Sequence, residues 1–359
     1  MIMSYSARQY YINLFKNRWF NFLHGTRAEK SIYINSSPNG EMRRYLYILA
    51  KFLAMNGYKV FVKAHFNIFK ALVDYANFFL DEANIVLVKK DIKADYIITY
   101  KEPSEPNEIQ MDYNYFGKGN GLYFPYPMQP GQYKFNYISQ IDKLRCNDRI
   151  ITALFMGGVS ENYKENEKLK PFRIKYGIVN RYEAYHFLLN EKDVVIVPVN
   201  SEEAMHCFNS DVRIDKTLLV NNINCIVQQP EWLKCMSKSD FIICLPGAEQ
   251  PMCHHAIEAM SVGTIPILQY NRLFNPPLED MKNCVLFKDL AHLRNLLSMI
   301  RSMPGDQVTE LRRNVIAYYD KYLSQVAFVK KFEEYMESDC YDKRLYINIE
   351  YPHSIEDMR

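Results

Sequence analysis

The chain has 359 residues, 48% of them hydrophobic, and its 44 Lys and Arg residues nearly balance its 41 Asp and Glu residues. Because one hydrophobic core rarely grows to this size, the length predicts two domains. The balanced charge excludes a surface dominated by one sign, so we expect no nucleic-acid partner. The eight cysteines form no C-x-x-C pair, which predicts reduced, packed side chains and no metal site.

The first segment, residues 10–23, mixes aromatic and basic side chains. A helix packed on the core is the favoured interpretation. A helix lying on a membrane surface is the alternative, and it would give peripheral membrane contact. No apolar stretch approaches the roughly 20 residues that span a bilayer, and no secretory signal is visible. We therefore expect a cytoplasmic protein, with attachment to the inner membrane face as the alternative.

The N-terminal half alternates between strand and helix patterns. Strands are predicted at 31–35, 59–63, 84–88 and 96–100, and helices at 42–53 and 67–80. This is the βαβ pattern of a parallel sheet. Residues 101–147 are rich in Pro, Gly, Asn and Tyr, and we expect irregular structure there. The first domain is therefore predicted to cover residues 1–147.

A second alternating series begins at residue 150 and predicts a domain at 148–325. Its strands are predicted at 150–156, 194–199, 224–227, 241–245, 265–268 and 284–287, and its last helices at 290–303 and 307–336. Residues 326–359 form the end of the last helix and a tail, whose packing the sequence leaves open. The fold class is α/β with two parallel sheets.

The loop after the strand at 241–245 is the main candidate for a binding site, because ligands of open parallel sheets bind beyond the carboxyl ends of the strands. Pro246 and Gly247 begin this loop, and a helix is predicted at 252–262. Glycine permits close backbone approach, and the first amides of a helix attract phosphate. We therefore expect a phosphate-bearing ligand here.

Three side chains of that helix fall on related faces. His254 lies four residues before Glu258, and His255 lies three residues before it, so either histidine can share a face with the carboxylate. We expect a histidine to contact a diphosphate and Glu258 to accept hydrogen bonds from a ribose. A structural role is the alternative for each histidine. Adjacent histidines diverge by about 100° around a helix, which argues against a shared metal.

Several motifs around this loop resemble the donor-binding half of exostosin-like and other GT-B glycosyltransferases. They are Ser-Asp-Phe-Ile-Ile-Cys-Leu-Pro-Gly at 239–247, Glu-Ala-Met at 258–260 and Gly-Thr-Ile-Pro at 263–266. Residues 275–279 and 284–287 continue the likeness, which covers residues 228–300. The resemblance implies two Rossmann-like domains whose parallel sheets face each other across a cleft.

The same resemblance implies an activity. It implies metal-independent transfer of a hexose or related sugar from a nucleotide-sugar to a hydroxyl, without a cofactor. A glycan or glycolipid would be the acceptor, and cell-surface polysaccharide biosynthesis would be the setting.

In the resembled family, the glutamate matching Glu258 holds the nucleotide ribose, and an arginine three positions earlier helps to bind the diphosphate. This chain has His255 at that position. Since histidine has a reference pKa near 6.5, donor affinity should depend on pH, or another cation should help. Some members carry two glutamates eight positions apart. Glu249 and Glu258 are nine apart, so Glu249 matches only in part, as a contact to the donor sugar.

Other donor-binding candidates rest on position alone. Gly157 and Gly158 follow the first strand of the second domain and could meet the diphosphate, and Gln228 could border the base. Arg213 and Lys216 fall between predicted strands and could supply positive charge. A solvated charge cluster is the alternative for these two.

The first domain should supply the acceptor site and, for an inverting enzyme, a general base. Residues 35–41, His65 and Asp112 are candidates because they lie in predicted loops, and no motif selects among them. The catalytic residue and the stereochemical outcome therefore stay open at this point.

Two further functions are compatible with the sequence. One is a nucleotide-sugar epimerase or hydrolase built on the same fold. The other is a catalytically inactive nucleotide-sugar-binding scaffold, which the missing arginine favours.

Overall fold

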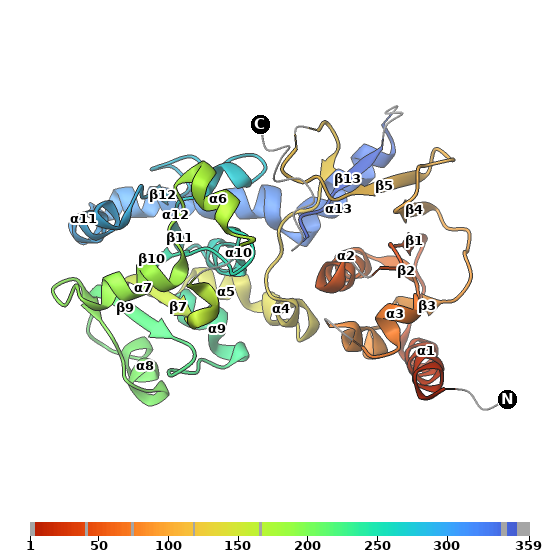
Figure 1. Cartoon of the computed structure of the whole chain (residues 1–359), viewed down its shortest axis with the longest axis horizontal. Helices are drawn as coiled ribbons and strands as arrows, with labels where there is room; N and C mark the ends of the chain where they lie inside the picture. Colours follow the sequence, from red (N-terminus) through yellow and green to blue (C-terminus); the bar gives the residue numbers. More distant parts are fainter. Residues whose placement is uncertain are drawn as a thin grey trace. The chain divides into compact units, whose positions relative to one another are not determined.

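The computed structural model describes residues 4–39, 42–72, 75–117, 119–164, 167–338 and 343–349. They form two units, each built on one parallel sheet, and the α/β prediction is confirmed (Figure 1). Met1–Pro125 and Ser324–Arg359 make the first unit, and Tyr126–Leu323 the second. Residues 126–147, which we expected in the first domain, thus group with the second unit. The helix after residue 324 groups with the first.

The first unit contains a seven-stranded sheet in the order β3-β2-β1-β4-β5-β13-β6, in which every neighbouring pair is parallel. Its strands are β1 (Lys30–Asn35), β2 (Tyr58–Lys63), β3 (Ile85–Val88), β4 (Tyr96–Thr99), β5 (Glu108–Asp112), β6 (Leu122–Tyr123) and β13 (Arg344–Tyr346). The order of the first five strands is that of a doubly wound α/β sheet.

The strand, helix and strand predicted at the start of this sheet are confirmed. Helix α2 (Arg43–Met55) packs on β2 and buries apolar side chains at helical spacing, such as Leu46, Leu49 and Leu53. Gly57 follows the helix with φ +90°, a conformation that glycine adopts without strain and that ends a helix.

The single helix predicted at 67–80 is wrong. The chain instead forms the short helix α3 (Phe66–Phe69) and the 3-10 helix η1 (Ala76–Asp81). Leu72 and Tyr75 adopt positive φ angles of 50° and 69°, which a right-handed helix cannot contain. The other helices of this unit are α1 (Tyr5–His24) and α13 (Gln325–Met336).

The last described residues complete the first sheet. Strand β13, blue in Figure 1, lies beside β5, with Leu345 opposite Met111, and it pairs with β6 on its other side. The long helix predicted at 307–336 is interrupted before this return. Ser324 caps α13 by accepting a hydrogen bond from the backbone amide of Ala327 at 3.2 Å.

The second unit contains a six-stranded parallel sheet in the order β12-β11-β10-β7-β9-β8. Its strands are β7 (Ile151–Gly157), β8 (Val195–Ile196), β9 (Ile214–Asn221), β10 (Ser239–Ile243), β11 (Ile265–Leu268) and β12 (Val285–Leu286). The strand predicted at 224–227 is wrong, because β9 ends before it. That segment turns instead, and the Asn222 side chain accepts a hydrogen bond from the Val227 amide at 2.7 Å.

The second unit also holds most of the helices. They are α4 (Pro130–Lys134), η2 (Tyr137–Gln140), α5 (Ile141–Arg145), η3 (Glu161–Tyr163), α6 (Lys170–Tyr176), α7 (Arg181–Leu189), α8 (Ser201–Phe208), α9 (Gln229–Met236), α10 (His254–Ser261), η4 (Asn271–Leu273), α11 (Leu290–Ile300), α12 (Gly305–Tyr318) and the π-helix η5 (Tyr319–Leu323). The expectation of irregular structure at 101–147 is wrong, since five short elements lie there. In the sheet, β7 lies between β9 and β10, so the chain order reverses beside β7.

The cysteines follow the sequence expectation in part. Of the seven described, five are buried, Cys146 is exposed, Cys207 is partly exposed, and none forms a disulfide. Cys340 lies outside the described residues.

Among the residues described, no helix combines the length and the apolar character needed to cross a bilayer.

Candidate functional site

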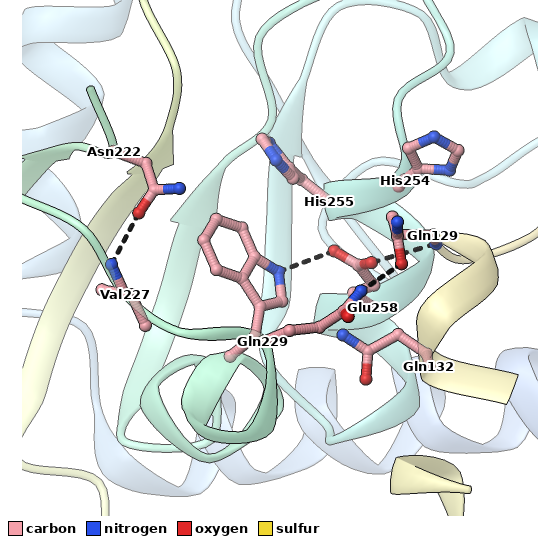
Figure 2. Close-up of a pocket in the computed structure, with 9 residues that line it drawn as sticks. Gln129, Gln132, Asn222, Val227, Gln229, His254, His255 and Glu258 are labelled. Atoms are coloured by element: carbon pink, nitrogen blue, oxygen red, sulfur yellow. Dashed lines mark hydrogen bonds between the residues drawn. The ribbon is translucent and has the colours of Figure 1, made fainter. Parts of the chain in front are cut away.

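A pocket lies in the second unit where β7 and β9 end and where α10 begins after β10. Its volume is about 230 Å³. It is lined by Gln129, Gln132, Asn222, Val227, Gln229, Trp232, His254, His255 and Glu258 (Figure 2). In doubly wound sheets, the point where the strand order reverses leaves a crevice that binds ligands. The pocket occupies this position in the sheet.

The centre of the pocket is the carboxylate of Glu258, which is 1% exposed. One oxygen accepts a hydrogen bond from Trp232 Nε1 at 2.8 Å, and the other accepts one from the Gln129 backbone amide at 3.1 Å (Figure 2). Burial raises the pKa of Glu258, and the nearby His255 opposes this rise. Because a carboxylate offers about four acceptor positions, two remain for the hydroxyl groups of a ligand.

His255 covers the end of β7. A Cβ atom built on Gly157 would lie only 2.5 Å from His255 Cε1, so the strand must end in glycine for the ring to fit. On its other side, the ring lies 5.6 Å from the Trp232 ring, measured between centroids. The structure thus brings together three predicted residues, Gly157, His255 and Glu258. It adds Trp232, which the sequence analysis missed.

His254 is also at the pocket but packs differently. Its Nδ1 lies 3.0 Å from the carbonyl oxygen of Pro127, and its ring stacks on Tyr126 with centroids 5.6 Å apart. This histidine therefore ties α10 to residues 126–127, and His255 is the one that faces the strand end.

Glutamine side chains form one side of the pocket. Figure 2 shows Gln129 and Gln132 on one side of Glu258 and Asn222 and Val227 on the other, with the Gln229 side chain reaching below the carboxylate to Gln129. Gln129 Oε1 accepts hydrogen bonds from the Gly131 amide at 2.6 Å and from Gln229 Nε2. Gln132 is 1% exposed, and its Oε1 has no partner among the described residues. A buried acceptor at a pocket wall is suited to a donor group of a ligand.

No protein-family model matches the chain, and no curated protein matches its sequence. Among solved structures, it is similar to Anabaena Alr3699/HepE in complex with UDP, at 12% identity over 85% of this chain and 98% of that chain, with a TM-score of 0.40. A glycosyltransferase from Rickettsia africae is 10% identical over 87% and 98%, with a TM-score of 0.38. A Listeria monocytogenes protein, provisionally assigned as a UDP-N-acetylglucosamine 2-epimerase, is 9% identical over 89% and 100%, with a TM-score of 0.38. Since these scores are below 0.5, function is inferred below from the residues of this chain.

A buried arginine lies beneath the pocket. Arg181, 3% exposed, donates hydrogen bonds to the carbonyl oxygens of Pro246 at 3.1 Å and Gly158 at 3.1 Å, and to Cys253 Sγ at 3.2 Å. It also donates to the carbonyl oxygen of Leu245 at 3.4 Å. Arg181 therefore joins the loops that follow β7 and β10.

Helix α10 begins later than the sequence analysis predicted, and Cys253 lies at its N-terminus. We predicted a start at residue 252, but α10 begins at His254, with Cys253 as its N-cap. Burial raises the pKa of the Cys253 thiol, but His255 and Arg181 outweigh this effect and lower it to about 5. At neutral pH the thiolate is therefore favoured. Its negative charge lies at the N-terminus of α10, where the helix dipole stabilises negative charge.

Three other predicted residues do not line the pocket. A Cβ atom on Gly247 would lie 2.8 Å from the Gln250 carbonyl oxygen, so this glycine allows a tight turn. Glu249 forms an ion pair with Lys168 at 2.9 Å. Gln228 is the N-cap of α9, directly between two residues of the pocket lining.

Arg213 and Lys216 lie away from the pocket. Arg213 precedes β9, and it contacts Asp240 at 2.8 Å and Thr152 at 3.2 Å, both at the amino ends of their strands. Lys216 donates to the Lys192 carbonyl oxygen at 2.9 Å. The sequence expectation placed them between strands because it missed β9. The amino end of a parallel sheet is opposite to its ligand-binding edge.

The candidate bases lie in the first unit. His65 follows β2, and burial, with a smaller effect of Lys63, lowers its pKa, which keeps the imidazole neutral at neutral pH. Its Nε2 has no partner among the described residues. Asp112 accepts hydrogen bonds from the Asn114 amide at 2.8 Å and from Arg344 at 3.2 Å. Of the range 35–41, residues 40 and 41 lie outside the described residues.

Within the described residues, no group of three or more His, Cys, Asp or Glu side chains is placed to hold a metal ion.

Proposed function

We propose that the second unit binds a nucleotide-sugar and that the chain is a glycosyltransferase, which passes the sugar to a hydroxyl acceptor. The observation that carries this proposal is the buried carboxylate of Glu258, held by Trp232 and Gln129 at the edge where parallel sheets bind ligands. Its two remaining acceptor positions suit the adjacent hydroxyl groups of a ribose. The family resemblance of residues 228–300 implies the same role.

The diphosphate would lie beside His255 and the loop that starts at Gly157. The described pocket lining contains no lysine or arginine, so histidine is its source of positive charge. An imidazolium preorganised at this point would stabilise the departing nucleoside diphosphate. Arg181 holds the loop carbonyls in place, and we propose no metal for this step.

The base would lie among the aromatic and amide groups of the lining. The ring of Trp232 offers a stacking surface. Gln132 Oε1 is a buried acceptor that an N–H group of a base would satisfy. Gln228 is flanked by Val227 and Gln229, which both line the pocket. The cavity of about 230 Å³ is slightly smaller than the roughly 300 to 1,000 Å³ of whole ligand sites, so it suits part of a nucleotide-sugar.

The finer parts of the proposal come from the resemblance. They are a hexosyl or related group, a glycan or glycolipid acceptor, and a setting in polysaccharide biosynthesis. For an inverting transfer, His65 is the better candidate base, because its imidazole is neutral and its Nε2 has no partner among the described residues. The carboxylate of Asp112 is already engaged by two donors.

A thermal-shift screen of nucleoside diphosphates and nucleotide-sugars tests the proposal. A ligand present at 100 times its dissociation constant adds about 2.7 kcal/mol of stability, which raises the melting temperature of a unit of this size by roughly 5 to 10 °C. We expect one diphosphate to give such a shift and Glu258→Ala to abolish it. Glu249→Ala is the matched control, since Glu249 lies outside the lining, and it should keep the shift. A shift that survives in Glu258→Ala would contradict the proposal.

A second candidate function is a nucleotide-sugar-binding protein without turnover. It is favoured by His255 standing where the resembled family has arginine. Product analysis separates the candidates: release of nucleoside diphosphate that requires an acceptor supports transfer, and release without acceptor supports hydrolysis. An altered sugar still attached to its nucleotide supports epimerisation. Binding with none of these products supports the second candidate.

A further inference from the structure

Helix α1 buries three asparagines against the protein and exposes large aromatic side chains on its opposite side. Asn13, Asn17 and Asn21 are buried and spaced four residues apart. Their side-chain amides donate to the carbonyl oxygens of Phe69 at 2.7 Å, Phe79 at 2.6 Å and Glu82 at 2.9 Å, respectively. Asn17 also accepts a hydrogen bond from the Leu87 amide at 2.8 Å. The helix is thus anchored by hydrogen bonds together with the packing of two buried side chains, Tyr10 and Leu14.

The opposite side of the helix carries exposed aromatic side chains. Phe15, Trp19 and Phe22 are 65%, 53% and 79% exposed. Their rings form one strip, with centroids 6.1 Å apart for Phe15 and Trp19 and 5.8 Å apart for Trp19 and Phe22. At about 100° per residue, this strip lies roughly 180° around the helix from the asparagines. Ile12 and Leu23 are also exposed and extend it.

Basic residues flank the aromatic strip. Arg8, Lys16 and Arg18 are exposed, and the helix contains no Asp or Glu. Lys89 lies next to the same helix, with its Nζ 4.6 Å above the Tyr11 ring. Aromatic side chains with flanking cations match an interface in which an apolar layer lies beneath anionic groups.

We propose that α1 binds the surface of an anionic lipid bilayer, lying in the plane of the headgroups with Phe15, Trp19 and Phe22 inserted. A 20-residue helix offers about 30 Å of contact. A second copy of the chain is the competing occupant. Symmetric pairing through this face would bring the arginines and the lysine of both copies together, and like charges oppose that pairing. The proposal is independent of the proposed function, since it involves neither the pocket nor turnover.

Co-sedimentation of the full chain with vesicles tests the proposal. We expect binding to mixed phosphatidylcholine and phosphatidylglycerol vesicles, weaker binding to phosphatidylcholine alone, and weakening by salt. Phe22→Gln should reduce the vesicle-bound to free ratio roughly tenfold, because a large apolar side chain is lost from the inserted face. Ile174→Gln on α6 is the matched control, since Ile174 is 78% exposed, and it should bind as the unmodified chain does.

Two companion measurements complete the test. Lys16→Glu should weaken binding to the anionic vesicles, whereas Lys175→Glu, also at an exposed lysine, should not. The chain has two tryptophans, so Trp232→Phe leaves Trp19 as the single reporter, and its emission should shift to the blue when anionic vesicles are added. Absence of vesicle binding, or equal effects of Phe22→Gln and Ile174→Gln, would overturn the proposal. Dimers in sedimentation velocity that Phe22→Gln dissociates would overturn it in favour of self-association.

Discussion

Replacing Gly157 by alanine should displace His255 and weaken ligand binding. The added Cβ would lie 2.5 Å from His255 Cε1, whereas carbon atoms in ordinary contact are about 3.5 to 4.0 Å apart. The ring must therefore move by about 1 Å, away from a position fixed between the strand end and Trp232. Because the clashing atom is the tip of a half-buried side chain that lines a pocket, this overpacking should cost about 1 kcal/mol of folding free energy, the low end of the range for packed cores. The displaced His255 would also lose its charge-assisted hydrogen bond to the diphosphate. Such a bond contributes about 1.5 to 3 kcal/mol to binding, so its loss should raise the dissociation constant roughly 10- to 150-fold.

The neighbouring glycine provides the matched control. A Cβ atom on Gly158 would have no heavy atom nearer than Ile223 Cγ1 at 4.0 Å. Its carbonyl oxygen, which accepts from Arg181, is unchanged by the substitution. We therefore expect Gly158→Ala to change stability by less than about 0.5 kcal/mol.

Titration calorimetry with a nucleoside diphosphate gives the dissociation constants, and urea unfolding gives the stabilities. The substitution His255→Ala removes the clashing ring, so Gly157→Ala should cost almost no stability in that background. The double-mutant cycle isolates this coupling. Equal effects of the two glycine substitutions on stability, or an undiminished stability cost of Gly157→Ala in the His255→Ala background, would refute the reasoning.

Two further predictions concern the groups around the pocket. In Glu258→Gln, the side-chain NH₂ group would face either Trp232 Nε1–H or the Gln129 amide, and both of these donors need an acceptor. The substitution should therefore lower the free energy of unfolding in urea by about 1 to 3 kcal/mol. The cost should be smaller in a Trp232→Phe background, and additive costs would contradict the hydrogen bond. The folded-state pKa of Cys253, about 5, lies below its ordinary value of 9.0, so its stabilising effect is complete above pH 9 and is lost as pH falls through 5. Cys253→Ser should therefore flatten the rise in unfolding free energy between pH 5.5 and 8, and an unchanged slope would exclude a thiolate.

Much of the fold could be predicted where a pattern is local. The strand, helix and strand from residue 30 to residue 63 carry alternating and helical apolar spacing, and the structure follows them. Strand β9 was missed because two charged residues, Asp215 and Lys216, follow its first residue and interrupt the apolar pattern. Strand β13 has only three residues, and its neighbours β5 and β6 lie more than 200 positions earlier in the sequence. No local pattern could indicate it.

The residues of the site also fall into those that a local pattern could predict and those that it could not. Helical spacing selected His255 and Glu258, and its position after an apolar strand selected Gly157. Gln129 and Gln132 belong to the short helix α4, as its N-cap and as one of its residues, and Trp232 belongs to α9; neither helix carries a motif. Only the tertiary structure brings these two helices to Glu258. The misplacement of Arg213 followed from the missed strand β9, since the register of a strand decides which end of the sheet a residue occupies.

The most direct test of the account is a crystal structure of the chain with a bound nucleoside diphosphate. We predict that the ribose hydroxyl groups lie within hydrogen-bond distance of the Glu258 carboxylate and that the phosphates lie beside His255 and Gly157. A diphosphate bound elsewhere, with Glu258 still contacted only by Trp232 and Gln129, would contradict it.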